Sequence, residues 1–154
     1  MKVRKIISGG QTGVDRAALD FALANGVEIG GFVPHGRIAE DGRIPDRYIG
    51  LTETASDDPA ERTELNVLNS DATLIIARGP LTGGSKLTAE FAGRYNKPHL
   101  QIDLNSVPPG SAPEIIRNWV ESIVCPSLNI AGPRASEDPE IYEMVSDILQ
   151  RAFV

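Results

Sequence analysis

Glycine and hydroxyl residues cluster in the stretch GPLTGGSKLTAE, which covers residues 79–90. This stretch follows the apolar run ATLIIA and precedes a helical pattern, so it lies where a strand passes into a helix. Free N–H groups at a helix N-terminus bind anions, and Gly83, Gly84 and Ser85 would supply them here, with Thr88 one turn further along. The pattern is typical of a phosphate cradle, although a tight turn without a ligand would use the same glycines.

Two well-known nucleotide-binding motifs are not matched. GPLTGGSK is close to G-x-x-x-x-G-K-[ST], but Ser85 precedes Lys86, whereas the NTPase motif has the lysine first. That order misplaces both the lysine for the phosphates and the hydroxyl for magnesium. The stretch GGQTG at residues 9–13 also differs from G-x-G-x-x-G. We therefore exclude an NTPase and find no support for a dinucleotide site of the usual kind.

Two further glycine-rich stretches follow predicted strands: SGGQTGVD at residues 8–15 and AGPRASEDP at residues 131–139. In an open parallel sheet, ligands bind beyond the carboxyl ends of the strands. Three such junctions on one edge favour a binding site over three plain turns. They add Asp15 and Arg134 as charged candidates, although an acid in the first turn of a helix also stabilises the helix dipole by itself.

Hydrophobic periodicity predicts the elements that position these loops. Strands are expected at residues 3–8, 27–33, 72–77, 99–104 and 127–132. Helices are expected at residues 14–25, from Asp58-Pro59 to Asn69, up to Asn96, from a capping box at SAPE (111–114), and from Asp138-Pro139. The alternation predicts an α/β fold, a three-layer Rossmann-like domain with a mostly parallel sheet of about five strands, in which residues 1–154 form one domain.

The segment between residues 34 and 58 has no steady period, and a loop of this length is more often functional than not. It contains His35, Arg37 and Arg43, which could form a lid over the site. Arginine suits bidentate contact with phosphate. A solvated loop is the alternative.

Composition excludes several classes of protein. A formal net charge of −6 argues against nucleic-acid binding. One cysteine, Cys125, allows no internal disulfide and no cysteine-based metal site, and it is expected to be buried. The two histidines have no metal-ligand spacing, so no metal site is predicted. Without a span-length apolar run or a signal peptide, we expect a cytoplasmic protein with no membrane partner.

The stretch GGSKLTAE resembles the P-G-G-x-G-T-x-x-E motif of the LOG, or lysine-decarboxylase-like, proteins. These are Rossmann-type enzymes that cleave the N-ribosidic bond of nucleoside monophosphates. The segment ERTELNVLNSDATLII is similar to their helix-then-strand segment. The resemblance implies that Arg62 and Glu90 are a functional pair, with Gly83, Gly84 and Thr88 holding phosphate. Lys86-Leu87 replaces the Gly-Thr of the enzymes, a departure that bears on catalysis more than on binding. The extra lysine suits a tightly held phosphorylated ligand, so Lys86 is also a candidate for phosphate binding.

Longer stretches resemble the circularly permuted YpsA-type branch of the SLOG superfamily, often described as putative molybdenum carrier proteins. They are SGGQTGVDRAALDFAL, VPHGRIAEDGRIPDRY, LTETASDDPAERTELNV and AGPR, and the resemblance covers nearly the whole chain. It implies a small phosphorylated ligand, either the molybdenum cofactor (molybdopterin) or a nucleotide, and a homo-oligomer. The wall opposite the phosphate cradle would comprise Gly9, Gly10, Gln11, Thr12, Gly13 and Asp15.

Three functions remain open from the sequence. The first is a carrier or sensor of a phosphorylated nucleotide-like or pterin ligand. The second is a LOG-like hydrolase in which Glu90 acts on the ribosyl centre and Arg62 positions the phosphate or ribose. The third is an interaction module without a ligand, because apolar helix faces can serve an oligomer as well as a core.

Overall fold

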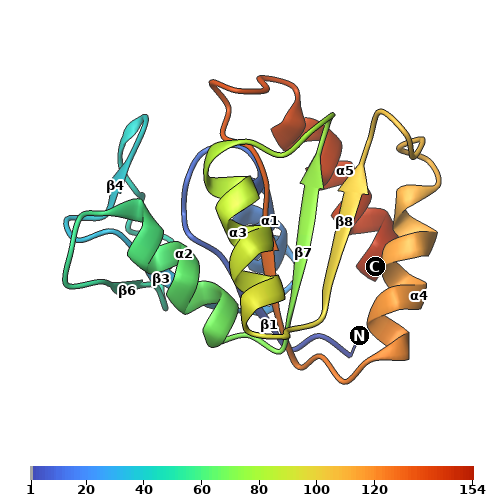
Figure 1. The fold of residues 1–154 in the computed structure, drawn as a ribbon, viewed down its shortest axis with the longest axis horizontal. Helices are drawn as coiled ribbons and strands as arrows, with labels where there is room; N and C mark the ends of the chain where they lie inside the picture. The colour runs from blue at the N-terminus through green and yellow to red at the C-terminus, as the bar shows by residue number, and fades with distance from the viewer. Residues whose placement is uncertain (1) are drawn as a thin grey trace.

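A five-stranded parallel sheet forms the centre of the computed structural model, which describes residues 2–154 (Figure 1). Its strands, in spatial order, are β2 (Glu28–Gly30), β1 (Lys5–Ile7), β9 (Ser127–Ala131), β7 (Ala72–Ala77) and β8 (His99–Asp103). The strand latest in the sequence is therefore the middle one. It pairs with β1 through Ile6 and Leu128 and with β7 through Leu74 and Ile130.

Five helices cover the two faces of the sheet: α1 (Val14–Ala24), α2 (Pro59–Leu68), α3 (Gly83–Arg94), α4 (Ala112–Ser122) and α5 (Ile141–Phe153). Helix α5 packs against both α1 and α4 on one face, while α2 packs against α3 on the other (Figure 1). The predicted three-layer Rossmann-like fold is thus confirmed. None of the helices within residues 2–154 combines the length and the apolar character needed to cross a membrane.

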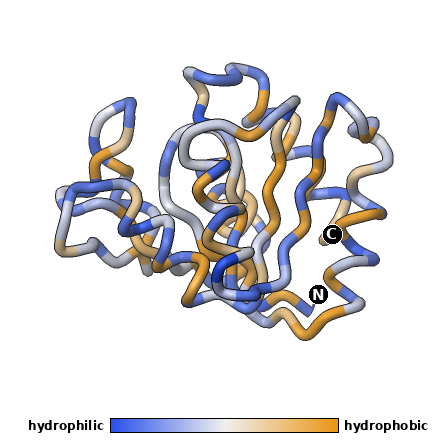
Figure 2. Tube along the Cα trace, in the orientation of Figure 1, coloured by the Kyte–Doolittle hydropathy of each residue, from blue (hydrophilic) through white to orange (hydrophobic). Residues whose placement is uncertain are grey.

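The core lies between the sheet and these helices. All six residues of β7 are buried, and the strand is hydrophobic along most of its length (Figure 2). A near-continuous apolar run is what a parallel strand covered on both faces requires. On α5, the buried residues Ile141, Val145, Ile148 and Leu149 repeat at helical spacing. Burying each such side chain contributes about 1.5–3 kcal/mol, so these stripes hold the helices on the sheet.

The single strand expected at residues 27–33 is wrong, because the chain bends within it. Gly31 has a φ of 129°, and a Cβ there would lie 2.2 Å from the carbonyl oxygen of Ser8. Beyond this bend, β3 (Phe32–Val33) leaves the main sheet and pairs with β6 (Thr52–Glu53). The segment expected to be irregular also contains an antiparallel hairpin, formed by β4 (Ile38–Ala39) and β5 (Gly42–Arg43).

Helix caps were predicted with mixed success. Asp58 caps α2 as expected, because its Oδ1 accepts the N–H of Ala60 at 3.0 Å. The capping box at α4 is wrong: Ser111 makes no side-chain cap and already has a helical backbone conformation. Helix α5 begins at Ile141 and not at Pro139. The carboxylate of Asp138 instead holds the guanidinium of Arg78, whose Nε donates at 2.8 Å.

Candidate functional site

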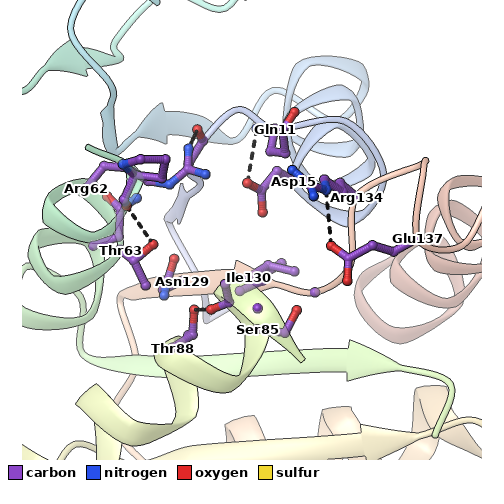
Figure 3. A pocket seen from close by; sticks show the side chains of 17 residues that line it. Gln11, Asp15, Arg62, Thr63, Ser85, Thr88, Asn129, Ile130, Arg134 and Glu137 are labelled. Carbon is purple, nitrogen blue, oxygen red and sulfur yellow. Dashed lines mark hydrogen bonds and ion pairs between the residues drawn. The ribbon is translucent and has the colours of Figure 1, made fainter. Parts of the chain in front are cut away.

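A cavity of about 280 Å³ lies at the carboxyl ends of the central strands, between the start of α1, α2, α3 and β9 (Figure 3). All three glycine-rich loops contribute to its wall. The residues that line it are Gly9, Gln11, Asp15, Pro59, Arg62, Thr63, Asn66, Gly83, Gly84, Ser85, Thr88, Asn129, Ile130, Ala131, Gly132, Arg134 and Glu137.

The N-terminus of α3 forms one wall and has no side-chain cap. The residue before the helix, Thr82, donates its hydroxyl to Glu137 at 3.1 Å instead of accepting a helix N–H. Within residues 2–154, the N–H groups of Gly83, Gly84 and Ser85 form no hydrogen bond. Unpaired N–H groups at the positive end of a helix dipole are suited to hold an anion.

The two glycines of this wall have different structural demands. Gly83 has a φ of 51°, a conformation that glycine adopts more readily than other residues. Gly84 has no such constraint, and a Cβ added to it would meet no protein atom within 4 Å. The backbone is therefore open to the cavity at both positions. Behind them, Thr88 is buried and donates its hydroxyl to the carbonyl of Gly84 at 2.8 Å.

Asp15 extends into the cavity from the first turn of α1 (Figure 3). The backbone N–H of Gln11 donates to its Oδ2 at 3.1 Å. Burial raises the pKa of Asp15 to about 6, while the charge of Arg62, the Gln11 hydrogen bond and the charge of Arg16 act in the opposite direction. The cavity thus contains a carboxyl group whose charge is incompletely compensated by the protein.

Arg62 reaches the cavity from α2, one turn after the cap residue Asp58. Its Nη1 donates to the carbonyl of Gly9 at 2.6 Å, and this hydrogen bond holds the side chain against the first glycine-rich loop. A Cβ on Gly9 would lie 3.1 Å from both Nη1 of Arg62 and Oδ2 of Asp15, so the two charged groups are neighbours. They nevertheless form no direct ion pair within the described residues 2–154.

The hairpin of β4 and β5 is tied to the rim of the site through Glu40. Its carboxylate accepts the hydroxyl of Thr12, and it accepts the N–H and hydroxyl of Ser136 at 3.0 and 2.5 Å. These hydrogen bonds, that of Ser136 first, lower the pKa of Glu40. Arg134, half exposed, lies 3.5 Å from Glu40 and 3.3 Å from Glu137. It therefore already has two carboxylate partners at the edge of the cavity.

The structure brings nine of the residues singled out from the sequence into the cavity wall. They are Gly9, Gln11, Asp15, Arg62, Gly83, Gly84, Ser85, Thr88 and Arg134. The remaining glycines of the first loop serve its fold. The N–H of Gly10 donates to Ser8 Oγ at 3.2 Å, and Gly13 packs so closely that a Cβ would lie 2.3 Å from the carbonyl oxygen of Pro133.

Other candidates do not line the cavity. Thr12 contacts Glu40, and both Lys86 and Glu90 are exposed on α3. Among the proposed lid residues His35, Arg37 and Arg43, the first and last are exposed and none reaches the cavity wall. Arg37 instead donates to the carbonyls of Ile44 and Pro45 at 3.2 and 2.8 Å, which holds the loop in shape.

Two groups of lining residues were missed from the sequence. Asn129 is a buried amide within the apolar strand β9, and its Nδ2 donates to the hydroxyl of Thr73 at 3.3 Å. A polar residue inside an otherwise apolar run was the available signal. Thr63 and Asn66 lie on the same side of α2 as the cavity, and Asn66 also pairs with the backbone of Phe32. Their spacing on the helix could have indicated a shared face.

No group of three or more His, Cys, Asp or Glu side chains within residues 2–154 is arranged to hold a metal ion. The polar groups of the cavity are backbone N–H groups, the guanidinium groups of Arg62 and Arg134, carboxyls, amides and hydroxyls. Such a set suits an organic anion with further hydrogen-bonding groups.

Fold and cavity define a Rossmann-like α/β protein with a ligand-sized site at the carboxyl edge of its sheet. The sequence model of the circularly permutated YpsA SLOG family matches residues 6–153, and the chain belongs to this family. A crystal structure described as that of a "Putative molybdenum carrier protein" from Syntrophus aciditrophicus SB is similar, with 52% sequence identity and a TM-score of 0.97. The similarity covers 99% of this chain and 96% of that chain. Among curated proteins, none matches the sequence.

Proposed function

We propose that this protein binds a phosphorylated nucleotide-like or pterin ligand in the cavity, with the phosphate on the N–H groups of Gly83, Gly84 and Ser85. The observation that carries the proposal is the uncapped N-terminus of α3, which opens into a cavity that Arg62 also lines. A helix N-terminus is a favourable partner for phosphate, and the guanidinium adds positive charge to the cavity that an anionic ligand would enter. The similar protein from Syntrophus aciditrophicus SB is described as a "Putative molybdenum carrier protein", and this description supports a carrier-type role.

Gly84 gives further support. Its backbone needs no positive φ and its surroundings would admit a Cβ, so the fold does not require glycine there. Glycine in a helix is less stable than alanine by roughly 0.5–1 kcal/mol. A ligand that approaches the backbone closely accounts for the residue, because any side chain at this position would extend into the cavity.

The residues of the cavity fit the molybdenum cofactor, which is a phosphorylated pterin. The N–H groups at α3 would hold its phosphate end, and Asp15, Asn129 and the guanidinium of Arg62 would offer hydrogen-bonding groups to its ring. When bound, the cofactor supplies the molybdenum chemistry. Because the described residues offer no cluster of metal ligands, the metal would be carried by the cofactor and not by side chains.

The position of Glu90 favours binding over hydrolysis of an N-ribosidic bond. Glu90 follows Thr88 by two residues, which turns it by about 200° around the helix axis. It is exposed, and it does not line the cavity. The residue that the LOG-like motif would use is therefore not directed at a ligand held by Gly83 and Gly84.

Native mass spectrometry on protein purified gently, without chelators or added nucleotide, tests the proposal. We expect an extra mass that corresponds to a nucleotide or a molybdopterin. The same spectra test whether the chain forms a homo-oligomer, as the family resemblance implies. Calorimetric titration with inorganic phosphate and nucleoside monophosphates then compares the wild type with Arg62→Met, which should bind the nucleotides more weakly, and with the control Arg151→Met, whose side chain lies on the surface of α5 and contacts Asp147. Bare protein mass, together with no measurable binding of phosphate or nucleoside monophosphates, would overturn the proposal.

A further inference from the structure

We propose that Asp15 and Arg62 recognise the ring of the ligand and select a heterocycle whose edge carries an amino group, a ring N–H and an oxo group side by side, as in guanine (2-amino-6-oxo) and pterin (2-amino-4-oxo). This inference rests on the proposed function, because it concerns the end of the ligand opposite the phosphate. Such an edge presents a ring N–H and an amino group as donors beside a carbonyl acceptor. An adenine-type edge instead places an acceptor nitrogen beside its amino group.

Asp15 supplies the acceptors. Its side chain is 9% exposed, and its single hydrogen bond within residues 2–154 is the one from the N–H of Gln11 to Oδ2. The second oxygen, Oδ1, has no partner. No fully buried side-chain oxygen or nitrogen among the described residues lacks a partner, so Oδ1 must be reached from the cavity. An ionised carboxylate is acceptor-only and can take two parallel N–H donors.

Arg62 supplies the donors next to this carboxylate. One of its N–H groups is used on the carbonyl of Gly9 at 2.6 Å, and a guanidinium has five. The two groups lie on either side of the space where Gly9 would carry a Cβ. Since they do not pair with each other, the cavity keeps a free acceptor beside a free donor. A ligand edge that complements this pattern carries two neighbouring N–H donors for the carboxylate and, beside them, a carbonyl oxygen for the guanidinium.

The burial of Asp15 favours a contact with the ring of the ligand over a contact with a ribose. Two of the three phosphate donors, Gly83 and Gly84, are exposed, whereas Asp15 is buried, as is the third donor, Ser85. In a nucleotide the ribose lies between the phosphate and the ring, so the ring is the part that reaches furthest. Burial also raises the pKa of Asp15 to about 6, which shows a poorly solvated carboxyl that a pair of N–H donors would stabilise.

Calorimetric titration of the full chain with GMP, IMP and AMP tests the inference. IMP lacks the 2-amino group, and AMP reverses the donor pattern. Because a bidentate contact to a base edge contributes about 1–3 kcal/mol, GMP should bind roughly tenfold to hundredfold more tightly than either. In Asp15→Asn, the amide oxygen can still accept the N–H of Gln11. The preference should move from GMP to xanthosine monophosphate (XMP), whose 2-oxo group accepts a hydrogen bond from the new amide N–H. Binding of inorganic phosphate should not weaken, because the substitution removes a negative charge from the cavity.

Three results would overturn the inference, and they differ in what they leave standing. Equal binding of GMP, IMP and AMP would refute recognition of the ring by Asp15 and Arg62. If the three nucleotides still competed with phosphate, the proposed function would stand. A loss with 2′-deoxy-GMP but not with IMP would assign Asp15 to the ribose. Absence of binding by all nucleotides and by phosphate would remove the proposed function as well. The control Asp147→Asn, on the exposed surface of α5, should behave as the wild type.

Discussion

Gly84→Ala should raise the stability of the protein and lower its affinity for phosphate at the same time. The added methyl group meets no protein atom within 4 Å, and the backbone conformation is ordinary. Relief of the glycine penalty should add up to about 1 kcal/mol to the free energy of unfolding. For a chain of this size, that raises the melting temperature by roughly 2–4 °C.

The loss of affinity follows from the position of the methyl group. It would stand where a phosphate oxygen must approach the N–H groups of α3, and a hydrogen bond to a charged group contributes about 1.5–3 kcal/mol. Losing one such bond weakens binding roughly tenfold to hundredfold. Thermal unfolding measures the first effect, and titration with inorganic phosphate and GMP measures the second.

Gly93→Ala is the matched control, because Gly93 is exposed in the same helix and a Cβ there also meets nothing within 4 Å. It should gain stability without losing affinity. If Gly84→Ala bound phosphate and GMP as tightly as Gly93→Ala, the phosphate could not lie on this helix N-terminus. If Gly84→Ala were destabilised, the argument that the fold tolerates a side chain there would fail.

Three further outcomes can be measured by unfolding and thiol chemistry. The pKa of Asp15 in the folded protein, about 6, exceeds its ordinary value of 3.8. The stability that this group contributes should therefore be complete below pH 3.8 and lost as the pH rises through 6. The free energy of unfolding should fall by up to about 3 kcal/mol over this range. Urea unfolding between pH 4 and 7 should show this loss in the wild type relative to Asp15→Asn; parallel curves would contradict it. Asp58→Ala removes the cap of α2 and should cost about 0.5–2 kcal/mol in urea unfolding, whereas a change near zero would mean that the cap is dispensable. Burial raises the pKa of Cys125 to about 11, so a thiol reagent should modify it at the rate of unfolding and not at that of an exposed thiol.

Local features of this fold were predictable because short-range interactions determine them. The run ATLIIA, from Ala72 to Ala77, becomes the fully buried strand β7, and Asp58 with Pro59 begins α2. The two glycine-rich stretches at Gly9 and Gly83 follow strands of one parallel sheet, so their meeting at one edge follows from topology. Asp15 and Arg62 could be named as candidates, although their proximity depends on how α1 and α2 are placed.

Long-range contacts were beyond such reasoning. Glu40 was not singled out, because its partners Thr12 and Ser136 are 28 and 96 residues away in the sequence. The exposure of Glu90 depends on the rotation of α3 about its axis, which packing against α2 determines. Asn129 was passed over because periodicity counts apolar residues, whereas its importance comes from its place in the middle of the central strand, where it lines the cavity.

The central position of β9 has a consequence for synthesis of the protein on the ribosome. Before Ser127–Ala131 emerge, β1 can pair only with β2 and β7 only with β8, because β9 is the strand that joins these two pairs. The nascent chain therefore holds two separate half-sheets until residues 127–131 have been translated. The same late strand brings Asn129 and Gly132 to the cavity wall. The proposed ligand site is therefore completed only once β9 has been added, and a chain that stops before it lacks part of the cavity wall.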